Sequence, residues 1–212
     1  MENEIVGKET PVDLDVVIAS DFRLPGGTTS SIAEEVRAQS VAGLTTGLLH
    51  LAGSVTNYPI PWSRHIQGVI DLPGVELLTP FSQVRTKLLM FRHPTVVFSN
   101  KNSLRGFHAD RVMVVANHAA IDAAGKQHYS IEETDAKVRE MFGVSPIWAP
   151  IGPVVRNTML EQTRAVPLRD TDWFNIFNVT SDGDLDPRTG FVSNVPVIGR
   201  HSRPQPGKWP SN

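Results

Sequence analysis

The sequence contains no cysteine among its 212 residues, which excludes disulfide bonds, thiolate catalysis and cysteine-ligated metal sites. It also lacks a charge excess, because 20 basic residues face 22 acidic ones and leave a formal net charge of −2. A balance of this kind argues against a surface that binds nucleic acid by electrostatic attraction. No apolar run approaches the roughly 20 residues of a transmembrane helix. We therefore expect neither a nucleic-acid partner nor a transmembrane segment.

What is present suits a folded α/β protein. Apolar residues make up 40% of the chain, enough for a core, and glycine and proline, 16 each, stay far below the range of disordered chains. The length corresponds to one large domain, or to a domain with part of another. The opening residues 1–4 are acidic and do not have the basic-then-apolar pattern of a signal peptide. The expected location is therefore cytoplasmic.

One stretch, residues 15–38, organises the rest of the chain. It begins as an apolar β-branched run, turns at Gly26 and Gly27, and continues as a helical pattern. Ser31 followed by Glu34 is typical of a capping box and predicts a helix over 31–42. A strand over 14–19, a turn and a helix make the first half of a βαβ unit, whose turn presents backbone N–H groups suited to a phosphate.

An alternative interpretation of the two glycines is that they only allow a sharp turn. The stretch is not a G-x-G-x-x-G motif, and it lacks the lysine of a P-loop. The local sequence leaves both interpretations open.

Later patterns extend the βαβ theme. The region 88–91 fits either a strand or the end of a helix, and Gly43 and Gly143 occupy positions for left-handed helix stops. The first three strands begin about thirty residues apart, as βαβ repeats do. We expect a Rossmann-like three-layer α/β sandwich with a mostly parallel sheet and right-handed crossovers. Further strands are expected at 45–51, 74–79, 111–116, 146–148 and 172–179, and further helices at 130–142 and 152–161.

Polar residues follow two of the expected strands. His50 lies near the end of one, and Asn117 and His118 directly follow another, at the edge where α/β sheets build their sites. The seven histidines include no pair at helix-face spacing, so no metal site is expected. The segment Asp182-Gly183-Asp184 has the form of a D-x-D metal motif. It comes later in the chain than the strands that such a motif should directly follow, so a solvated turn is the preferred interpretation.

Two segments carry a resemblance to a known family. Residues 21–39, with Pro25-Gly26-Gly27-Thr28, and residues 43–50 resemble the first domain of a GT-B glycosyltransferase, closest to the retaining enzymes of family four in an actinobacterial-type branch. Residues 196–210, with Gly199-Arg200 and Lys208, resemble the opening of that family's second domain. The similarity runs along nearly the whole chain and is most specific in these segments.

The resemblance implies a fold, a reaction and site residues. Two Rossmann-like domains would face each other, the first binding an acceptor and the second a nucleoside diphosphate sugar. Gly26 and Gly27 match the loop that approaches the donor diphosphate, and Arg200 and Lys208 match the pair that neutralises it. His118 takes roughly the place of the active-site histidine. Candidates on the acceptor side are Thr28, His50 and Asn117.

The match departs from the family in two respects. The arginine-to-lysine spacing is eight residues, longer than usual, and the paired acidic motif of the second domain is absent. We expect residues 1–195 to form the acceptor-side domain and residues 196–212 to be a linker and the first residues of a donor domain. Alone, such a fragment would be inactive, and it would need no cofactor other than its donor substrate.

Two other functions compete with sugar transfer. The chain would act as a non-catalytic Rossmann-like module if the Gly-Gly loop simply binds a phosphorylated ligand. A nicotinamide oxidoreductase is the third candidate, but it lacks both the glycine fingerprint and an acidic residue at the end of the second strand, where His50 and Leu51 stand.

Overall fold

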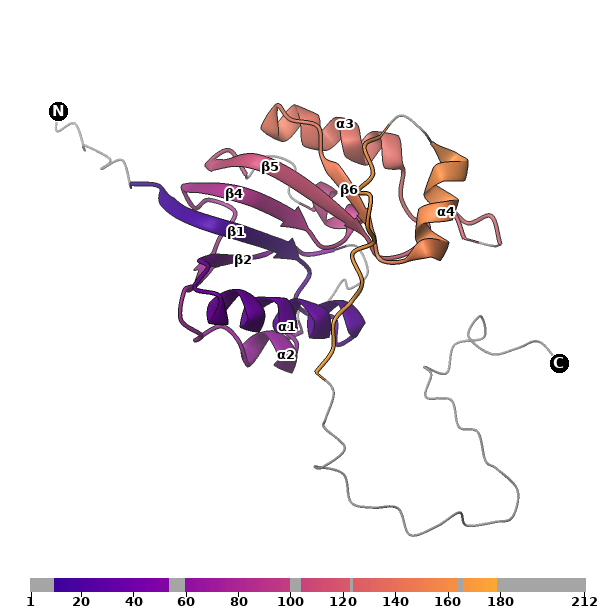
Figure 1. Ribbon diagram of the computed structural model, residues 1–212. Helices are drawn as coiled ribbons and strands as arrows, with labels where there is room; N and C mark the ends of the chain where they lie inside the picture. The colour runs from indigo at the N-terminus through magenta and orange to yellow at the C-terminus, as the bar shows by residue number, and fades with distance from the viewer. Residues whose placement is uncertain (1–9, 54–59, 100–103, 123, 164–165, 179–212) are drawn as a thin grey trace, which may run out of the picture. The chain divides into compact units, whose positions relative to one another are not determined.

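The structure is a computed structural model that describes residues 10–53, 60–99, 104–122, 124–163 and 166–178 (Figure 1). Its centre is a six-stranded sheet in which every neighbouring pair of strands is parallel, in the order β3-β2-β1-β4-β5-β6. This confirms the predicted Rossmann-like α/β fold. The strands are β1 (Val12–Ser20), β2 (Thr46–His50), β3 (Val75–Leu78), β4 (Val84–Phe91), β5 (Phe107–Ala116) and β6 (Ile147–Pro150).

Helices cover both faces of the sheet (Figure 1). One face carries α1 (Gly27–Val41) and the short α2 (Arg64–Gln67), and its core includes Val16, Ile18 and Ile32. The other face carries α3 (Ile131–Phe142), α4 (Pro153–Gln162) and the 3₁₀ helix η1 (Pro94–Phe98). Both faces of the central strands are thus buried, which explains their nearly continuous apolar sequences.

The strand order reverses direction between β1 and β4. From β1 the chain builds outward through β2 to β3, and it then returns to the other side of β1 for β4, β5 and β6. In open parallel sheets, ligands bind outside the carboxyl ends of the strands at such a switch point. A ligand site is therefore expected where β1 and β4 end.

Helix α1 begins four residues earlier than predicted, at Gly27 rather than Ser31. Gly26 is its N-cap, and the side chain that bonds back to the N-cap backbone is that of Thr29. Thr29 Oγ1 accepts from the Gly26 N–H at 3.3 Å and donates to the Leu24 carbonyl at 2.7 Å. Ser31 is instead fully buried inside the helix. The predicted Ser31–Glu34 box is therefore wrong.

The helix expected over 130–142 forms as α3, and a serine caps its start. The Ser130 hydroxyl accepts from the Glu133 N–H at 3.1 Å at the start of α3. Gly43 and Gly143 follow α1 and α3 with φ of 73° and 68°, the left-handed conformation that favours glycine.

Two regions needed the structure to define them. Residues 88–91 belong to a strand, because β4 runs through to Phe91. The strand expected over 172–179 does not form in its described part, residues 172–178, which has no regular secondary structure. The Trp173 N–H donates to Pro150 O at 2.7 Å, but no ladder follows.

The segment 172–178, called the strap below, closes part of the sheet that α1 and α2 leave open. Trp173 packs against an apolar cluster of Met90, Met113 and neighbouring residues on β4, β5 and β6. The Arg169 guanidinium lies over the Trp173 ring, with its Cζ 5.1 Å from the ring centroid. Toward the amino ends of β1 and β4, the exposed surface carries the ion pairs Asp13–Arg85 and Asp15–Lys87 instead.

The described residues through Phe177 belong to one compact unit. The predicted boundary between residues 195 and 196 lies outside the described residues, as do Arg200, Lys208 and the Asp182–Asp184 motif.

Candidate functional site

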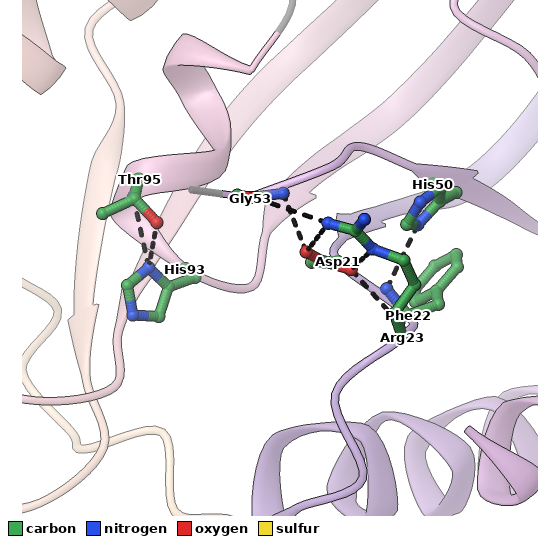
Figure 2. A network of polar contacts seen from close by, with 7 residues as sticks. All are labelled: Asp21, Phe22, Arg23, His50, Gly53, His93 and Thr95. Atoms are coloured by element: carbon green, nitrogen blue, oxygen red, sulfur yellow. Dashed lines mark hydrogen bonds and ion pairs between the residues drawn. The ribbon is translucent and has the colours of Figure 1, made fainter. Parts of the chain in front are cut away.

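Asp21, directly after β1, anchors a polar network at the carboxyl edge of the sheet (Figure 2). Arg23 donates to both carboxylate oxygens, from Nε at 2.8 Å and from Nη2 at 2.7 Å, and the Gly53 N–H adds a third bond at 2.8 Å. These bonds to the charged form lower the pKa of Asp21 against the opposing effect of burial. The network links the ends of β1 and β2 and neutralises the Arg23 cation.

His50, a predicted acceptor-side residue, lies at the end of β2 beside this network (Figure 2). Its Nδ1 accepts from the Phe22 N–H at 3.2 Å, and its ring contacts Phe22 and Trp62 at centroid distances of 5.9 and 5.5 Å. Burial lowers the pKa of His50, which favours the neutral ring. Its Nδ1 is therefore committed to holding the turn after β1.

A pair of histidines joins the ends of β4 and β5. Nε2 of His93 lies 3.0 Å from Nε2 of His118. His93 Nδ1 must accept from the Thr95 N–H at 3.2 Å, because a backbone N–H only donates. The His93 proton therefore lies on Nε2 and is donated to His118, whose own proton lies on Nδ1 and is donated to Ala119 O at 2.8 Å.

This chain of bonds is consistent only with two neutral rings. Protonating His118 at Nε2 would put two N–H groups face to face at 3.0 Å, and protonating His93 at Nδ1 would oppose the Thr95 N–H at 3.2 Å. Burial, together with the nearby His118 and His128, lowers the pKa of His93 to about 4, which fits this requirement. Both ring nitrogens of His118, the predicted catalytic residue, are engaged within the protein, so a ligand that bonds to its Nε2 displaces His93.

Two residues of the loop that follows β5 also contact His118. The Tyr129 O–H donates to the His118 carbonyl at 2.7 Å, and the His128 ring lies 5.0 Å from the His118 ring. His128 in turn contacts the Asp122 carboxylate through Nε2 at 2.9 Å. The expected polar residue after β5 is therefore the centre of a larger cluster.

A cavity of about 420 Å³ opens between these two networks. Its wall includes Gly53 of the Asp21 network and Thr95, whose hydroxyl contacts His93 Nδ1 at 2.7 Å. Its volume lies within the range of roughly 300–1,000 Å³ typical of small-molecule sites. We call it the edge cavity; its lining residues are Ala52, Gly53, Thr95, Phe98, Ser99, His128, Tyr129, Ser130 and Glu133.

The remaining predicted residues meet at the first turn of α1. Asn117 Nδ2 donates to Thr28 Oγ1 at 2.8 Å, which brings together two of the acceptor-side candidates from positions 89 apart in the sequence. Asn117 Oδ1 is buried without a hydrogen-bond partner among the described residues. Gly26 has an extended φ of −163°, a conformation open to any residue. A Cβ on Gly27 would lie 3.8 Å from the Phe177 ring, an ordinary contact.

A buried ion pair lies beneath this turn. Arg92, with 0% of its side chain exposed, follows β4 and places Nη1 3.1 Å from Glu35 Oε1 on α1. Arg92 Nη2 also donates to Ser31 Oγ at 3.2 Å, which explains why Ser31 is buried rather than capping the helix. The Trp173 indole N–H donates to Glu35 Oε1 at 3.0 Å. Burial raises the pKa of Glu35 despite the nearby Arg92 cation.

Sequence reasoning missed Asp21, His93 and Arg92 as members of these networks. Asp21 and Arg92 directly follow strands, as Asn117 does, and that position is the signal that would have found them. His93 stands before a proline at the end of a strand, which also marks a turn there.

Among the described residues, no group of three or more histidine, aspartate or glutamate side chains is arranged to hold a metal ion. Within that same part of the chain, none of the helices has both the length and the apolar character needed to cross a membrane. Comparisons with protein-family models, with curated proteins and with solved structures found no match for the chain.

Proposed function

We propose that this chain is the acceptor-binding part of a glycosyltransferase that uses a nucleoside diphosphate sugar. The proposal rests on the resemblance of residues 21–39 and 196–210 to the GT-B family and on the fold of the described residues. The observation that carries it is the edge cavity, which lies between networks at the ends of β1, β2, β4 and β5. An acceptor domain needs a small-molecule site at this edge.

In this proposal the acceptor occupies the edge cavity and the donor approaches the first turn of α1. The backbone N–H groups after Gly26 and the dipole of α1 favour a diphosphate there. Arg200 and Lys208 supply the cations that stabilise the charge gained by the leaving group. His118 binds the transferred sugar after its Nε2 exchanges His93 for a sugar hydroxyl.

One observation favours the non-catalytic alternative. Asp21 and Arg23 neutralise each other, and both nitrogens of His118 are bonded within the protein. A module that only binds a ligand needs no free acid or base at its site. The two functions differ in whether a donor domain follows residue 212.

The reading frame beyond Asn212, and the activity of the protein it encodes, test the proposal. We expect a second Rossmann-like domain and release of nucleoside diphosphate that depends on an added acceptor. Changing Gly27 to Val should lower this rate about a hundredfold, the usual effect of losing one well-placed donor to developing charge. Gly143→Ala, at the end of α3, is the control for a general loss of stability, because its φ of 68° strains the backbone although its added Cβ meets no atom within 4 Å.

Two results would contradict the proposal. One is a reading frame that ends near residue 212 without a partner domain. The other is a well-folded Gly27→Val enzyme that transfers sugar at the wild-type rate, since the first turn of α1 would then be only a turn.

A further inference from the structure

We infer that the edge cavity takes an uncharged, hydroxyl-rich acceptor, a sugar or a polyol, rather than a phosphorylated one. The inference rests on the proposed function and narrows its acceptor class. It follows from three properties of the wall: its charge, its hydrogen-bonding capacity and its aromatic surface.

The charge of the wall does not suit an anion. Among the described residues that line the cavity, none is a lysine or arginine, and the one carboxylate is that of Glu133. Gly53 belongs to the Asp21 network, in which the Arg23 guanidinium is already paired with both oxygens of the Asp21 carboxylate. His128 is likewise matched by the Asp122 carboxylate at 2.9 Å. A phosphate dianion in the cavity would meet Glu133 without a free counter-charge on the described wall.

The N-terminus of α3 does not reverse this balance. Its capping hydroxyl, from Ser130, already accepts the Glu133 N–H at 3.1 Å. The first turn also contains Glu132 and Glu133, which offset the positive end of the helix dipole.

The wall is rich in hydrogen-bond acceptors. The Glu133 carboxylate forms no hydrogen bond or ion pair with any residue that the structure describes. The Thr95 hydroxyl is bonded to His93 Nδ1, which can only accept there, so its oxygen keeps lone pairs for a ligand. Ser99 Oγ is buried with no partner among the described residues. A ligand hydroxyl can donate to Glu133 and to Thr95, whereas a phosphate dianion has no proton to donate. The Ser99 hydroxyl can donate as well as accept, so it suits either ligand.

An aromatic surface completes the site. Phe98 lines the cavity and is 42% exposed, although large apolar residues are usually buried. Tyr129 lines it too, and its hydroxyl is committed to His118 O. A sugar ring presents hydroxyls at its edge and C–H groups on its faces, so it matches a wall that combines acceptors with ring surface.

The test is a titration of this chain, followed by backbone amide NMR, with matched pairs of probes. The probes are the methyl glycosides of glucose, galactose and mannose, and myo-inositol, each beside its monophosphate ester. We expect at least one uncharged probe to shift the amides of residues 95–99 and 128–133 and to bind at least tenfold more tightly than its phosphate. Glu133→Gln should weaken that binding about tenfold and Ser99→Ala about fivefold. Glu132→Gln, an exposed neighbour outside the cavity, should leave it unchanged.

The outcomes separate the two proposals. A phosphate ester that binds at these amides more tightly than its uncharged partner overturns the inference on acceptor class, while acceptor binding, and with it the proposed function, stands. Binding of an uncharged probe that Glu132→Gln weakens as much as Glu133→Gln also overturns the assignment to this wall. If no probe of either kind shifts these amides, both the inference and an acceptor site in the edge cavity are overturned, and only the transfer assay still bears on the enzyme class.

Discussion

Arg92 and Glu35 form a buried ion pair that ties α1 to the end of β4. Removing one partner of such a pair leaves the other charge buried without compensation, which typically costs about 3–5 kcal/mol. We therefore expect Arg92→Met to lower the free energy of unfolding by that amount. Urea denaturation followed by circular dichroism measures the loss.

The double change Arg92→Met with Glu35→Gln separates charge from packing. It removes both charges and keeps an acceptor for the Trp173 indole N–H. We expect it to be less destabilised than Arg92→Met alone, because no uncompensated charge remains. A double variant that loses as much stability as the sum of the two single variants would show that the pair is not coupled.

His93 makes stability depend on pH. Its pKa is about 4 in the folded protein and about 6.5 in an unfolded chain, so the unfolded state binds the proton more tightly. Stability from this group is complete above about pH 6.5 and is lost as the pH falls toward about 4, up to about 3 kcal/mol at 1.4 kcal/mol per pKa unit. Urea midpoints at several pH values in this window should fall less steeply for His93→Gln than for the wild type.

The His93→Gln variant is a fair comparison because the glutamine amide keeps a donor for His118 Nε2. Other acidic groups titrate alike in both proteins and cancel in the difference. One of them, Asp15, has its pKa lowered to about 2 by the Lys87 ammonium and by Thr45. Identical pH dependence in the two proteins would contradict the proton assignment of the histidine pair.

Residue chemistry was only partly predictable from the sequence. His50, Asn117 and His118 were predicted at strand ends, and the structure places them there. Their partners were not predictable, because Thr28 and Asn117 come together only when β1 and β5 lie on either side of β4. Local sequence contains no information on such long-range contacts.

At the scale of an element, glycines in similar contexts have different roles. Gly143 ends α3 with a φ of 68°, where an added Cβ meets no atom within 4 Å, so only backbone strain opposes substitution. We expect Gly143→Ala to cost about 1–2 kcal/mol. Gly27 is the first residue of α1 and is not among the residues with positive φ, so Gly27→Ala should change stability by less than about 0.5 kcal/mol.

Thermal denaturation of the two glycine variants beside the wild type is the measurement. A larger loss for Gly27→Ala than for Gly143→Ala would show that the start of α1 is strained.

The two helix starts show where local patterns succeed and fail. Ser130 directly precedes the amphipathic helix α3, and its hydroxyl caps that helix, as the local spacing to Glu133 indicates. Ser31 has the same spacing to a glutamate, but its hydroxyl is drawn inward by Arg92, 61 positions later in the chain. The tertiary contact overrides the local signal, and the helix extends back to Gly27.

The whole described unit depends on the strap for part of its cover. A chain that ends at Asp172 loses the Trp173 ring over Met90 and Met113 as well as its bond to Glu35. We expect such a chain to melt at least about 5 °C below the full chain, since each 1 kcal/mol shifts the midpoint of a protein of this size by roughly 2–4 °C. A chain that ends at Asn178 should melt cooperatively within about 2 °C of the full chain.

The melting temperatures of the three chains are measured by circular dichroism at one protein concentration. Loss of cooperativity in the chain that ends at Asn178 would mean that residues beyond it are needed for folding.

The fold as a whole was the most predictable level. Apolar β-branched runs separated by capped helical patterns predict a parallel sheet with helices on both faces, and that sheet is present. The strand order was not predictable in detail, nor was the use of an irregular segment in place of a last strand. Residues 172–178 have the aromatic content of a strand, but they cross the carboxyl edge of the sheet and bond to α1.

The strap also has a mechanical consequence. A pull on the chain at Asn178 reaches the Ile176 N–H bond to Ser31 and then the Trp173 bond to Glu35, both on α1, before it reaches Pro150 of β6. Along the chain, the load therefore meets helix α1 before it meets the outer strand of the sheet. Tension from anything attached beyond Asn178 would thus be carried first by Ser31 and then by Glu35, on the helix whose first turn holds Thr28 beside Asn117.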